Sequence, residues 1–335
     1  MKISYGTYPW AMGVPGGGEM QIRSYLNALR KGKNKWLNIE VEFFNQWEPG
    51  FHNINIMHYF SCIPSSADFL AYVRFNQHIP VVLSPNFWPD PEGWEKSGVL
   101  ENIKKILWTA DRIIVNSWIE EEAMVRLCNI DSSYISVVHN AVDDIFFEPV
   151  SSNLFKEKYN INIPYVLNVA NVEPRKNQLA FLKALKNFPD LQLITIGNWR
   201  EKWYLDACKA EGDNQFRLIG PLDPGSELLR SAIAGCEFFA MPSLRETPSI
   251  ASLEAAAAGA KILTTDLGSP IEYFEKYVIY INPYDVNSMT EGIQSALIHY
   301  NERTLVEHIK THYRWDSVIE KLVQIYLDVI NNLRH

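Results

Sequence analysis

Short apolar runs alternate with helical patterns along most of the 335-residue chain, and this alternation limits the possible folds more than any other feature. The first apolar run covers residues 2–5, and the helical pattern after it places Ile22, Leu26 and Leu29 on one face. Apolar runs of this length that alternate with amphipathic helices are typical of βα units built on a parallel sheet. Further strands are predicted near residues 41–44, 54–59, 81–83, 113–115 and 135–138.

The alternation starts again after residues 148–153, a polar segment with the composition of a linker. The helical pattern after the next apolar run carries Leu179, Leu182 and Leu185 on one face. Strands are predicted near residues 165–170, 191–196, 216–219, 238–240, 262–264 and 278–281, and an amphipathic helix over 315–333. The sequence therefore predicts an α/β protein of two doubly wound parallel-sheet domains that face a cleft, in which ligands bind at the carboxyl ends of the strands. The two predicted domains are residues 1–150 and 151–315.

The charge balance and the cysteines exclude several classes of protein. The chain carries 31 basic and 39 acidic residues, and its net charge of −8 argues against non-specific nucleic-acid binding. The first residues lack the apolar core of a signal peptide, and no run of 18 apolar residues predicts a membrane span. The four cysteines form no Cys-x-x-Cys pair and are interpreted as reduced thiols of a cytoplasmic protein. His308 and His312 are interpreted as a solvated helix face, so no metal site is expected.

Three glycines, Gly16, Gly17 and Gly18, follow the first predicted strand and open the first helix. Their spacing from Gly13 resembles a P-loop, but Glu19 stands where that motif needs a lysine. Residues without side chains would let a substrate approach the backbone N–H groups at the helix N-terminus. A tight turn is the alternative interpretation, and the position after a first strand favours the ligand loop.

The segment from Pro242 to Gly259 carries the most specific pattern in the chain. Glu246 lies in a predicted loop, and Glu254 lies on a helix predicted to start near Ser249. Roughly 7 Å of helix rise plus the loop would separate the two carboxylates, too far for a reliable acid–base pair. The spacing suits two anchors at opposite ends of one elongated ligand, with a diphosphate at the helix N-terminus between them. A nucleoside diphosphate sugar has this layout.

This segment resembles the Glu-x7-Glu signature of the retaining GT4-type glycosyltransferases (glycosyl transferases group 1), which have the GT-B fold of two Rossmann-like domains. The family's other motifs follow in the same order, and the likeness covers nearly the whole chain. These motifs match residues 110–117 (ADRIIVNS), 137–143 (VVHNAVD) with Phe146, 166–176, 217–220 (RLIG), 268–274 (GSPIEYF) and Trp315. The resemblance implies that the C-terminal helix, about residues 316–335, crosses back to the first domain.

The resemblance also implies roles for individual residues. Glu246 would contact the hydroxyls of the donor sugar, Glu254 the ribose and Lys176 the phosphates, and Glu246 and Lys176 are the catalytic candidates. The candidate nucleotide-sugar-binding residues are Gly16, Gly17, Gly18, Asn171, Arg175, Lys176, Asn198, Gly220, Leu222, Glu246, Thr247, Pro248, Ser249, Ile250 and Glu254. Adjacent Asp143 and Asp144 form no spaced Asp-x-Asp motif and are interpreted as structural. No metal or other cofactor is expected.

The chain departs from the family pattern at three places, one of which is Pro248, a residue without a backbone N–H in the family's Glu-Gly-Phe-Gly stretch. Asn171 stands where the family has a phosphate-binding arginine, and Arg175 is the nearest substitute. The family's first-domain histidine has no counterpart in the segment Ser84-Pro85-Asn86. Residues 86–94 form an aromatic-rich loop whose side chains either stack on an acceptor sugar or pack against one another. The acceptor-side candidates are His58, Asn86 and Trp88.

The resemblance predicts a cytoplasmic glycosyltransferase that moves a sugar from a nucleoside diphosphate sugar to a glycan or lipid-linked acceptor, with retention and without a metal. Peripheral contact with the inner face of a membrane stays open, and the sequence indicates no oligomeric state. The alternatives are a non-catalytic protein that binds sugar nucleotides or glycans, and a sugar-nucleotide epimerase or phosphorylase. We further expect Lys176→Ala to abolish transfer with little loss of stability, as for an exposed lysine.

Overall fold

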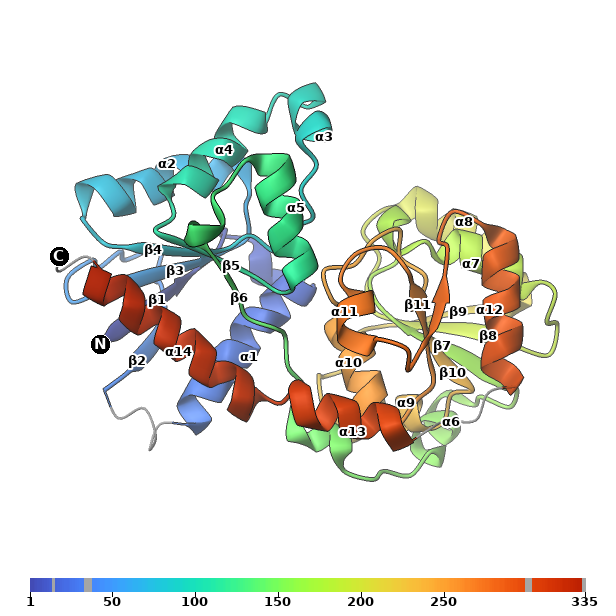
Figure 1. The fold of residues 1–335 in the computed structure, drawn as a ribbon. Helices are drawn as coiled ribbons and strands as arrows, with labels where there is room; N and C mark the ends of the chain where they lie inside the picture. The colour runs from blue at the N-terminus through green and yellow to red at the C-terminus, as the bar shows by residue number, and fades with distance from the viewer. Residues whose placement is uncertain (14–15, 33–37, 299–302, 333–335) are drawn as a thin grey trace. The chain divides into compact units, whose positions relative to one another are not determined.

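A computed structural model describes residues 1–13, 16–32, 38–298 and 303–332 (Figure 1). The chain forms two compact units. The first unit contains Met1–Asn140 together with the chain from Trp315 onward, and the second contains Ala141–Arg314. Among the described residues, no helix is long and apolar enough to cross a membrane.

The first unit is built on a six-stranded parallel sheet with the order β2-β1-β3-β4-β5-β6. Its strands are β1 (Lys2–Gly6), β2 (Glu40–Phe43), β3 (Ile56–Phe60), β4 (Val81–Ser84), β5 (Arg112–Val115) and β6 (Ile135–Val137). Its helices are α1 (Gly17–Lys31), α2 (Ala67–Ala71), α3 (Pro91–Lys96), α4 (Leu100–Thr109), α5 (Trp118–Cys128) and α14 (Trp315–Asn332). From β1 the chain continues to β2 on one side, and from β3 it continues to β4, β5 and β6 on the other side. The topological switch point of the sheet therefore lies between β1 and β3, at their carboxyl ends.

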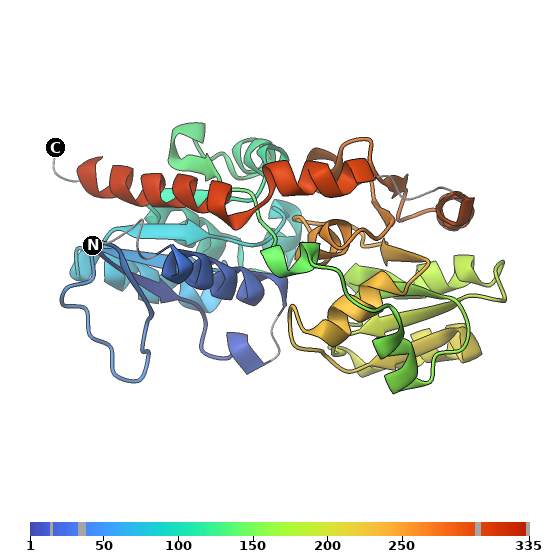
Figure 2. The same cartoon turned by 90° about the horizontal axis from the view of Figure 1, so that it is seen from below.

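Helices cover both faces of the first sheet. Figure 1 shows α1 and α14 on one face and α2, α4 and α5 on the other. The last helix packs beside the first one, as Figure 2 also shows, and the rings of Tyr25 and Trp315 meet edge to face 5.5 Å apart. On the opposite face, Met57, Leu70 and Ile106 belong to one buried apolar cluster. The residues 333–335 of the predicted C-terminal helix lie outside the described residues.

The second unit repeats this architecture with a six-stranded parallel sheet of order β12-β11-β10-β7-β8-β9. Its strands are β7 (Tyr165–Val169), β8 (Gln192–Ile196), β9 (Phe216–Ile219), β10 (Phe238–Met241), β11 (Ile262–Thr265) and β12 (Ile279–Ile281). Its helices are α6 (Asn153–Tyr159), α7 (Gln178–Leu185), α8 (Lys202–Gly212), α9 (Glu227–Ala234), α10 (Ile250–Ala257), α11 (Pro270–Phe274), α12 (Val286–Ile298) and α13 (Arg303–His312). Two apolar clusters enclose the sheet: Val166 of β7 belongs to one, and its neighbour Leu167 belongs to the other.

The predicted fold class is confirmed, because apolar runs in both halves form the strands of two parallel sheets. The division between the units falls after Asn140, whereas the sequence suggested residue 150. Tertiary contacts explain the difference: the Val142 N–H donates to the Tyr313 carbonyl at 2.8 Å, and the Phe146 side chain is buried in the core of the second unit. The polar composition of residues 148–153 therefore does not mark the end of the first unit.

Candidate functional site

The second unit places a buried ion pair at the carboxyl ends of two adjacent strands. Lys176 ends the short helix η6 (Pro174–Lys176) that follows β7, and Glu246 lies in the loop that follows β10. Lys176 Nζ lies 2.6 Å from Glu246 Oε1, and the side chains are only 13% and 4% exposed. The two residues are 70 positions apart in the sequence and meet because β7 and β10 pair directly.

The electrostatic environment keeps Glu246 ionised. Burial raises the pKa of its carboxyl group, but the charges of Lys176 and Arg175 outweigh this effect, and the pKa lies below its usual value. Burial lowers the pKa of Lys176, while the Glu246 carboxylate opposes this shift. The site therefore contains an anionic oxygen that can accept hydrogen bonds beside a desolvated ammonium group.

Two arginines extend this charge cluster. Arg175 donates to Glu173 at 3.0 Å and lies 3.9 Å from Glu246 Oε1, and Arg200 Nε lies 3.3 Å from the other oxygen of Glu173. Both guanidinium groups are exposed, in contrast to Lys176. Sequence reasoning missed Arg200, although its position after β8, at the carboxyl edge of the sheet, is a usable signal.

Asn171, which replaces the family's arginine, holds two loops together. Its Oδ1 accepts the backbone N–H of Asn198 at 3.2 Å, and its carbonyl accepts Gln178 Nε2 at 3.0 Å. The loop after β7 is thereby fixed against the loop after β8. The exposed guanidinium groups of Arg175 and Arg200 can form bidentate contacts with a phosphate.

The loop that carries Glu246 is held by its backbone. The Glu246 N–H donates to the Leu267 carbonyl at 3.3 Å, and its own carbonyl accepts the Ser269 N–H at 2.9 Å. Between these contacts Gly268 has φ +94°, and a Cβ there would lie 2.3 Å from the Glu246 carbonyl oxygen. A glycine is required at this close approach. A further hydrogen bond, from Leu244 N–H to the Arg175 carbonyl, joins this loop to the cationic loop.

The helix predicted to begin near Ser249 does begin there. Ser249 is the N-cap of α10, and its Oγ accepts the Ser252 N–H at 3.1 Å. The neighbouring candidates lie on both sides of this N-cap: Thr247 and Pro248 come before it, and Ile250 is the first residue of α10. The candidate residues at the start of α10 are therefore continuous with the loop that carries Glu246. The helix ends at Ala257.

Glu254 lies on α10 in an unusual environment. Its side chain is half-buried, and burial together with the Asp143 carboxylate raises its pKa to about 8. Glu254 is therefore mostly protonated at neutral pH and can both donate and accept hydrogen bonds. Asp143 precedes the short helix η5 (Asp144–Phe147), which packs against α10. The sequence predicted a purely structural role for Asp143 and did not predict this electrostatic interaction with Glu254.

The remaining second-unit candidates lie at the same edge of the sheet. Asn198 follows β8, whereas Gly220 and the half-buried Leu222 follow β9. The loops after β10, β7, β8 and β9 thus hold all the second-unit candidates except Ile250, the first residue of α10, and Glu254, which lies one helical turn inside this helix. Among the described residues, no three His, Cys, Asp or Glu side chains gather in a group that could hold a metal ion.

The first unit holds the glycine loop and the acceptor-side candidates. Gly16 N–H donates to Glu19 Oε2 at 2.7 Å, so the loop is the N-terminal cap of α1. Asn86 follows β4, and its Nδ2 would lie 3.2 Å from a Cβ at Gly18, so these residues come together. A Cβ added at Gly17 would meet no atom within 4 Å, and Trp88 is half-buried in the loop after β4.

The structure corrects the prediction for His58. Its ring is fully buried on β3, with Nδ1 2.6 Å from Tyr326 Oη and Nε2 2.9 Å from Ser84 Oγ. Burial lowers the pKa of His58 to about 3, so the ring is neutral, and both nitrogens already have partners. His58 is part of the core that joins α14 to the sheet and does not line a ligand site.

The structure corrects the predicted aromatic loop at residues 86–94, because its second half forms the start of α3 with Asp90 as N-cap. The rings of Phe87 in the loop and Trp94 on α3 meet edge to face 5.0 Å apart, so this segment packs against itself. A different aromatic cavity lies at the carboxyl ends of β1, β2 and β3. It measures about 420 Å³ and is lined by Thr7, Pro9, Phe44, Gln46, Pro49, Phe51, Tyr59, Ser65, Ser66, Phe69 and Tyr72. Sequence reasoning missed this cavity because its aromatic residues come from four separate segments.

Profiles of two known families match the chain. "Glycosyl transferases group 1" matches residues 151–310, and "Glycosyltransferase Family 4" matches residues 16–145. The chain belongs to the GT4-type glycosyltransferases. The motifs at residues 110–117, 137–143, 166–176, 217–220 and 268–274, which carry the sequence resemblance, fall within these two matched ranges.

Solved structures place this glycosyltransferase in the GT-B fold. Anabaena Alr3699/HepE in complex with UDP-glucose superposes with a TM-score of 0.80 at 16% identity, covering 98% of this chain and 100% of that chain. Sucrose-phosphate synthase from Thermosynechococcus elongatus superposes with a TM-score of 0.78 at 15% identity, covering 99% of both chains. At this identity the likeness concerns the fold alone.

The curated relatives of this glycosyltransferase align with it over only part of their own length. One subunit of the human phosphatidylinositol N-acetylglucosaminyltransferase is 25% identical over 69% of this chain and 49% of its own length. The D-inositol 3-phosphate glycosyltransferase of Mycobacteroides abscessus is 23% identical over 86% of this chain and 68% of its own length. The chain thus spans from about half to about two thirds of these relatives.

Proposed function

We propose that this glycosyltransferase transfers a hexose from a nucleoside diphosphate sugar to a glycan or lipid-linked acceptor, without a metal ion and with retention at the anomeric carbon. The observation that carries the proposal is the buried pair of Lys176 and Glu246, flanked by the exposed Arg175 and Arg200. The complex of UDP-glucose with a protein of the same fold supports a nucleotide sugar as donor. Retention rests on the family resemblance alone.

The charges fit a donor that carries a sugar next to a diphosphate. The ionised Glu246 accepts hydrogen bonds from the hydroxyls of the donor sugar, since a buried carboxylate offers acceptors and no donor. Arg175 and Arg200 bind the phosphate oxygens, which compete with Glu173 for their guanidinium groups. Lys176 stabilises the negative charge that develops on the diphosphate as the glycosidic bond breaks.

This arrangement needs no side-chain nucleophile. The departing diphosphate is itself a base, and in front-face departure it accepts the proton of the acceptor hydroxyl that attacks the anomeric carbon. Three cations on one sheet edge offset the charge that a divalent metal would otherwise neutralise. Glu254, mostly protonated near neutral pH, binds the ribose hydroxyls as both donor and acceptor.

The aromatic cavity of the first unit supports an acceptor with an apolar portion. The rings of Phe44, Phe51 and Phe69 form its walls, with Phe44 5.3 Å from Phe51 and 5.4 Å from Phe69. Several of its polar groups already have partners within the protein: Tyr59 Oη lies 2.6 Å from Ser66 Oγ. An apolar aglycone or lipid chain fits such a cavity better than a sugar ring, because buried sugar hydroxyls would lack hydrogen-bond partners there.

A binding screen tests the donor. Calorimetry against UDP, GDP and ADP, each with and without a sugar, is expected to select one base. Arg175→Ala and Arg200→Ala should each weaken the selected diphosphate by ~10- to 100-fold, since a hydrogen bond to a charged group contributes about 1.5–3 kcal/mol. Lys186→Ala, an exposed cation paired with Glu211, is the matched control. Equal binding by all three variants would remove the proposed phosphate site.

A second experiment tests the acceptor. Octyl and methyl glycosides of the same sugars are compared as acceptors with the selected donor. Phe69→Ala should raise the KM of the octyl compounds while leaving that of the methyl compounds unchanged. Phe75→Ala, whose ring is exposed outside the cavity, is the control. If the octyl chain gives no advantage in the wild type, the cavity does not bind the acceptor.

A further inference from the structure

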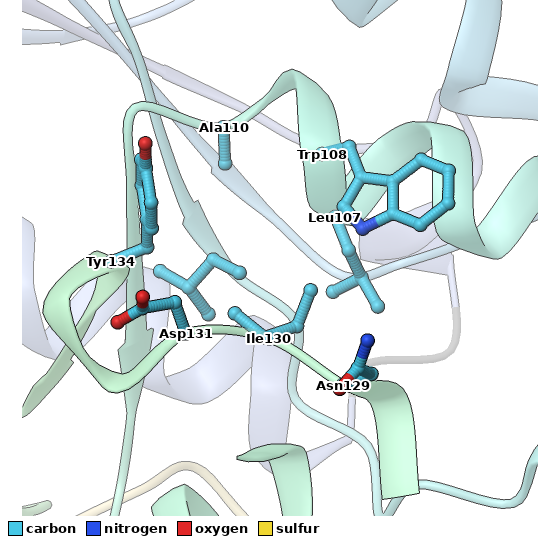
Figure 3. A pocket seen from close by; sticks show the side chains of 8 residues that line it. Leu107, Trp108, Ala110, Asn129, Ile130, Asp131 and Tyr134 are labelled. Atoms are coloured by element: carbon cyan, nitrogen blue, oxygen red, sulfur yellow. The ribbon is translucent and has the colours of Figure 1, made fainter.

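A second cavity of the first unit lies at the amino ends of its strands, opposite the end that holds the aromatic cavity. It measures about 330 Å³ and is lined by Leu107, Trp108, Ala110, Ile113, Asn129, Ile130, Asp131 and Tyr134 (Figure 3). These residues come from the end of α4, the start of β5 and the segment that leads into β6. The cavity is therefore at the amino ends of the strands, whereas the glycine loop and the aromatic acceptor cavity lie at their carboxyl ends.

Two exposed aromatic side chains flank this cavity. Figure 3 places Trp108 on one side and Tyr134 on the other, and they are 65% and 54% exposed. Within the described part of the chain, neither side chain makes a hydrogen bond or a ring contact. Exposed rings of this size leave apolar surface in water that a ligand can cover, and each ring also carries a polar handle.

The lining of the cavity combines buried apolar residues with exposed polar ones. Leu107 and Ile130 are buried beneath the rings, and Figure 3 shows the Asn129 amide directed toward the cavity. Asn129 is held in the left-handed region (φ 54°) as the C-cap of α5. Asp131 is oriented by the Ser133 N–H, which donates to its Oδ1 at 2.8 Å. The Asp131 carboxylate thus has a hydrogen bond that orients it, and Asn129 has a defined backbone conformation.

We propose that this cavity binds one neutral sugar residue of a glycan. A sugar ring has apolar C–H faces that cover aromatic rings, and hydroxyls that pair with amide and carboxylate oxygens, which matches Trp108, Asn129 and Asp131. The lining contains the Asp131 carboxylate and no cation, and the neighbouring Arg112 guanidinium donates to the Ser133 carbonyl, so the lining favours a neutral ligand over an anionic one. Burying Asn129 and Asp131 under an acyl chain would leave their polar atoms without partners.

Such a subsite lies within the first unit alone, at the end of the strands opposite the glycine loop of that unit. None of its lining residues belongs to the second unit, so its occupancy can be measured without a nucleotide. Glycan binding at this cavity is therefore independent of the donor that the second unit takes, and each can be measured without the other.

Saturation-transfer NMR with neutral disaccharides and tetrasaccharides of glucose, galactose, mannose and N-acetylglucosamine tests the proposal. The wild type, saturated with its nucleotide, should bind at least one tetrasaccharide, and Trp108→Ala should weaken it at least tenfold. Asn129→Ala should weaken it severalfold. Trp47→Ala, which removes a tryptophan that is 90% exposed in the same unit, is the matched control and should bind as the wild type does.

Three results would overturn the proposal. The first is that no neutral oligosaccharide in the panel binds. The second is that Trp108→Ala binds as strongly as Trp47→Ala. The third is that binding is lost in Phe69→Ala and kept in Trp108→Ala, which would assign the sugar to the acceptor cavity. Nucleotide affinity, measured on the same samples, should be equal in all variants, so a failed donor assignment is recognised separately.

Discussion

Removing Lys176 should destabilise the second unit as well as stop transfer. From the sequence we expect Lys176→Ala to cost little stability, but the structure places this side chain in a buried pair with Glu246. Truncation leaves a carboxylate that is almost fully buried and whose nearest remaining cation, Arg175, lies 3.9 Å away. Breaking a buried ion pair by removing one partner costs about 3–5 kcal/mol. We expect about 3 kcal/mol, because Arg175 compensates in part.

A double-mutant cycle separates the pair from its neighbours. Lys176→Met combined with Glu246→Gln removes both charges, and its cost should fall well below that of Lys176→Met alone. Urea unfolding followed by circular dichroism supplies the free energies, with transfer activity measured on the same samples. The matched control is Arg175→Ala, whose exposed guanidinium should contribute less than about 1 kcal/mol.

The pH dependence gives a further check on the buried pair. The folded-state pKa of Glu246 is depressed, so its ionisation contributes stability above its unfolded pKa, and this contribution is lost as the pH falls through the folded-state value. The cost of Lys176→Ala should therefore shrink as the pH is lowered toward about 4. A cost below about 1 kcal/mol at neutral pH, similar to that of Arg175→Ala, would refute the buried-pair argument.

Three other predictions follow from single contacts. The pKa of Glu254 is raised to about 8, so the native state keeps a proton that the unfolded state loses, and the free energy of unfolding falls as the pH rises from about 4.5 to 8. Between about pH 6 and 9, urea unfolding should show the wild type losing roughly 3 kcal/mol more than Glu254→Gln. Gly268→Ala should lower stability by about 1–3 kcal/mol and weaken donor binding, because its Cβ would clash with the Glu246 carbonyl; an unchanged melting temperature would contradict this. Tyr326→Phe should cost about 1–3 kcal/mol in thermal unfolding, since it leaves a buried nitrogen of His58 without a partner, while nucleotide affinity stays at the wild-type value.

Local sequence patterns were sufficient to predict the architecture of both units. Short apolar runs separated by amphipathic helices can bury their surface only in parallel sheets covered on both faces, and this information is local. The loop position of Glu246, the helix start at Ser249 and the place of Lys176 after a strand follow from the same local patterns. Loops after strands gather at one edge of a parallel sheet, so the second-unit candidates could be grouped from the sequence alone.

The contacts of these side chains depend on the tertiary structure. The pairing of Lys176 with Glu246 requires β7 to lie beside β10. The hydrophobic periodicity of the two segments predicts that each is a strand, but it does not predict which strands are neighbours. The burial of His58 depends on α14, whose Tyr326 comes from the far end of the chain. The raised pKa of Glu254 depends in the same way on Asp143, since charge and desolvation act through space and not along the sequence.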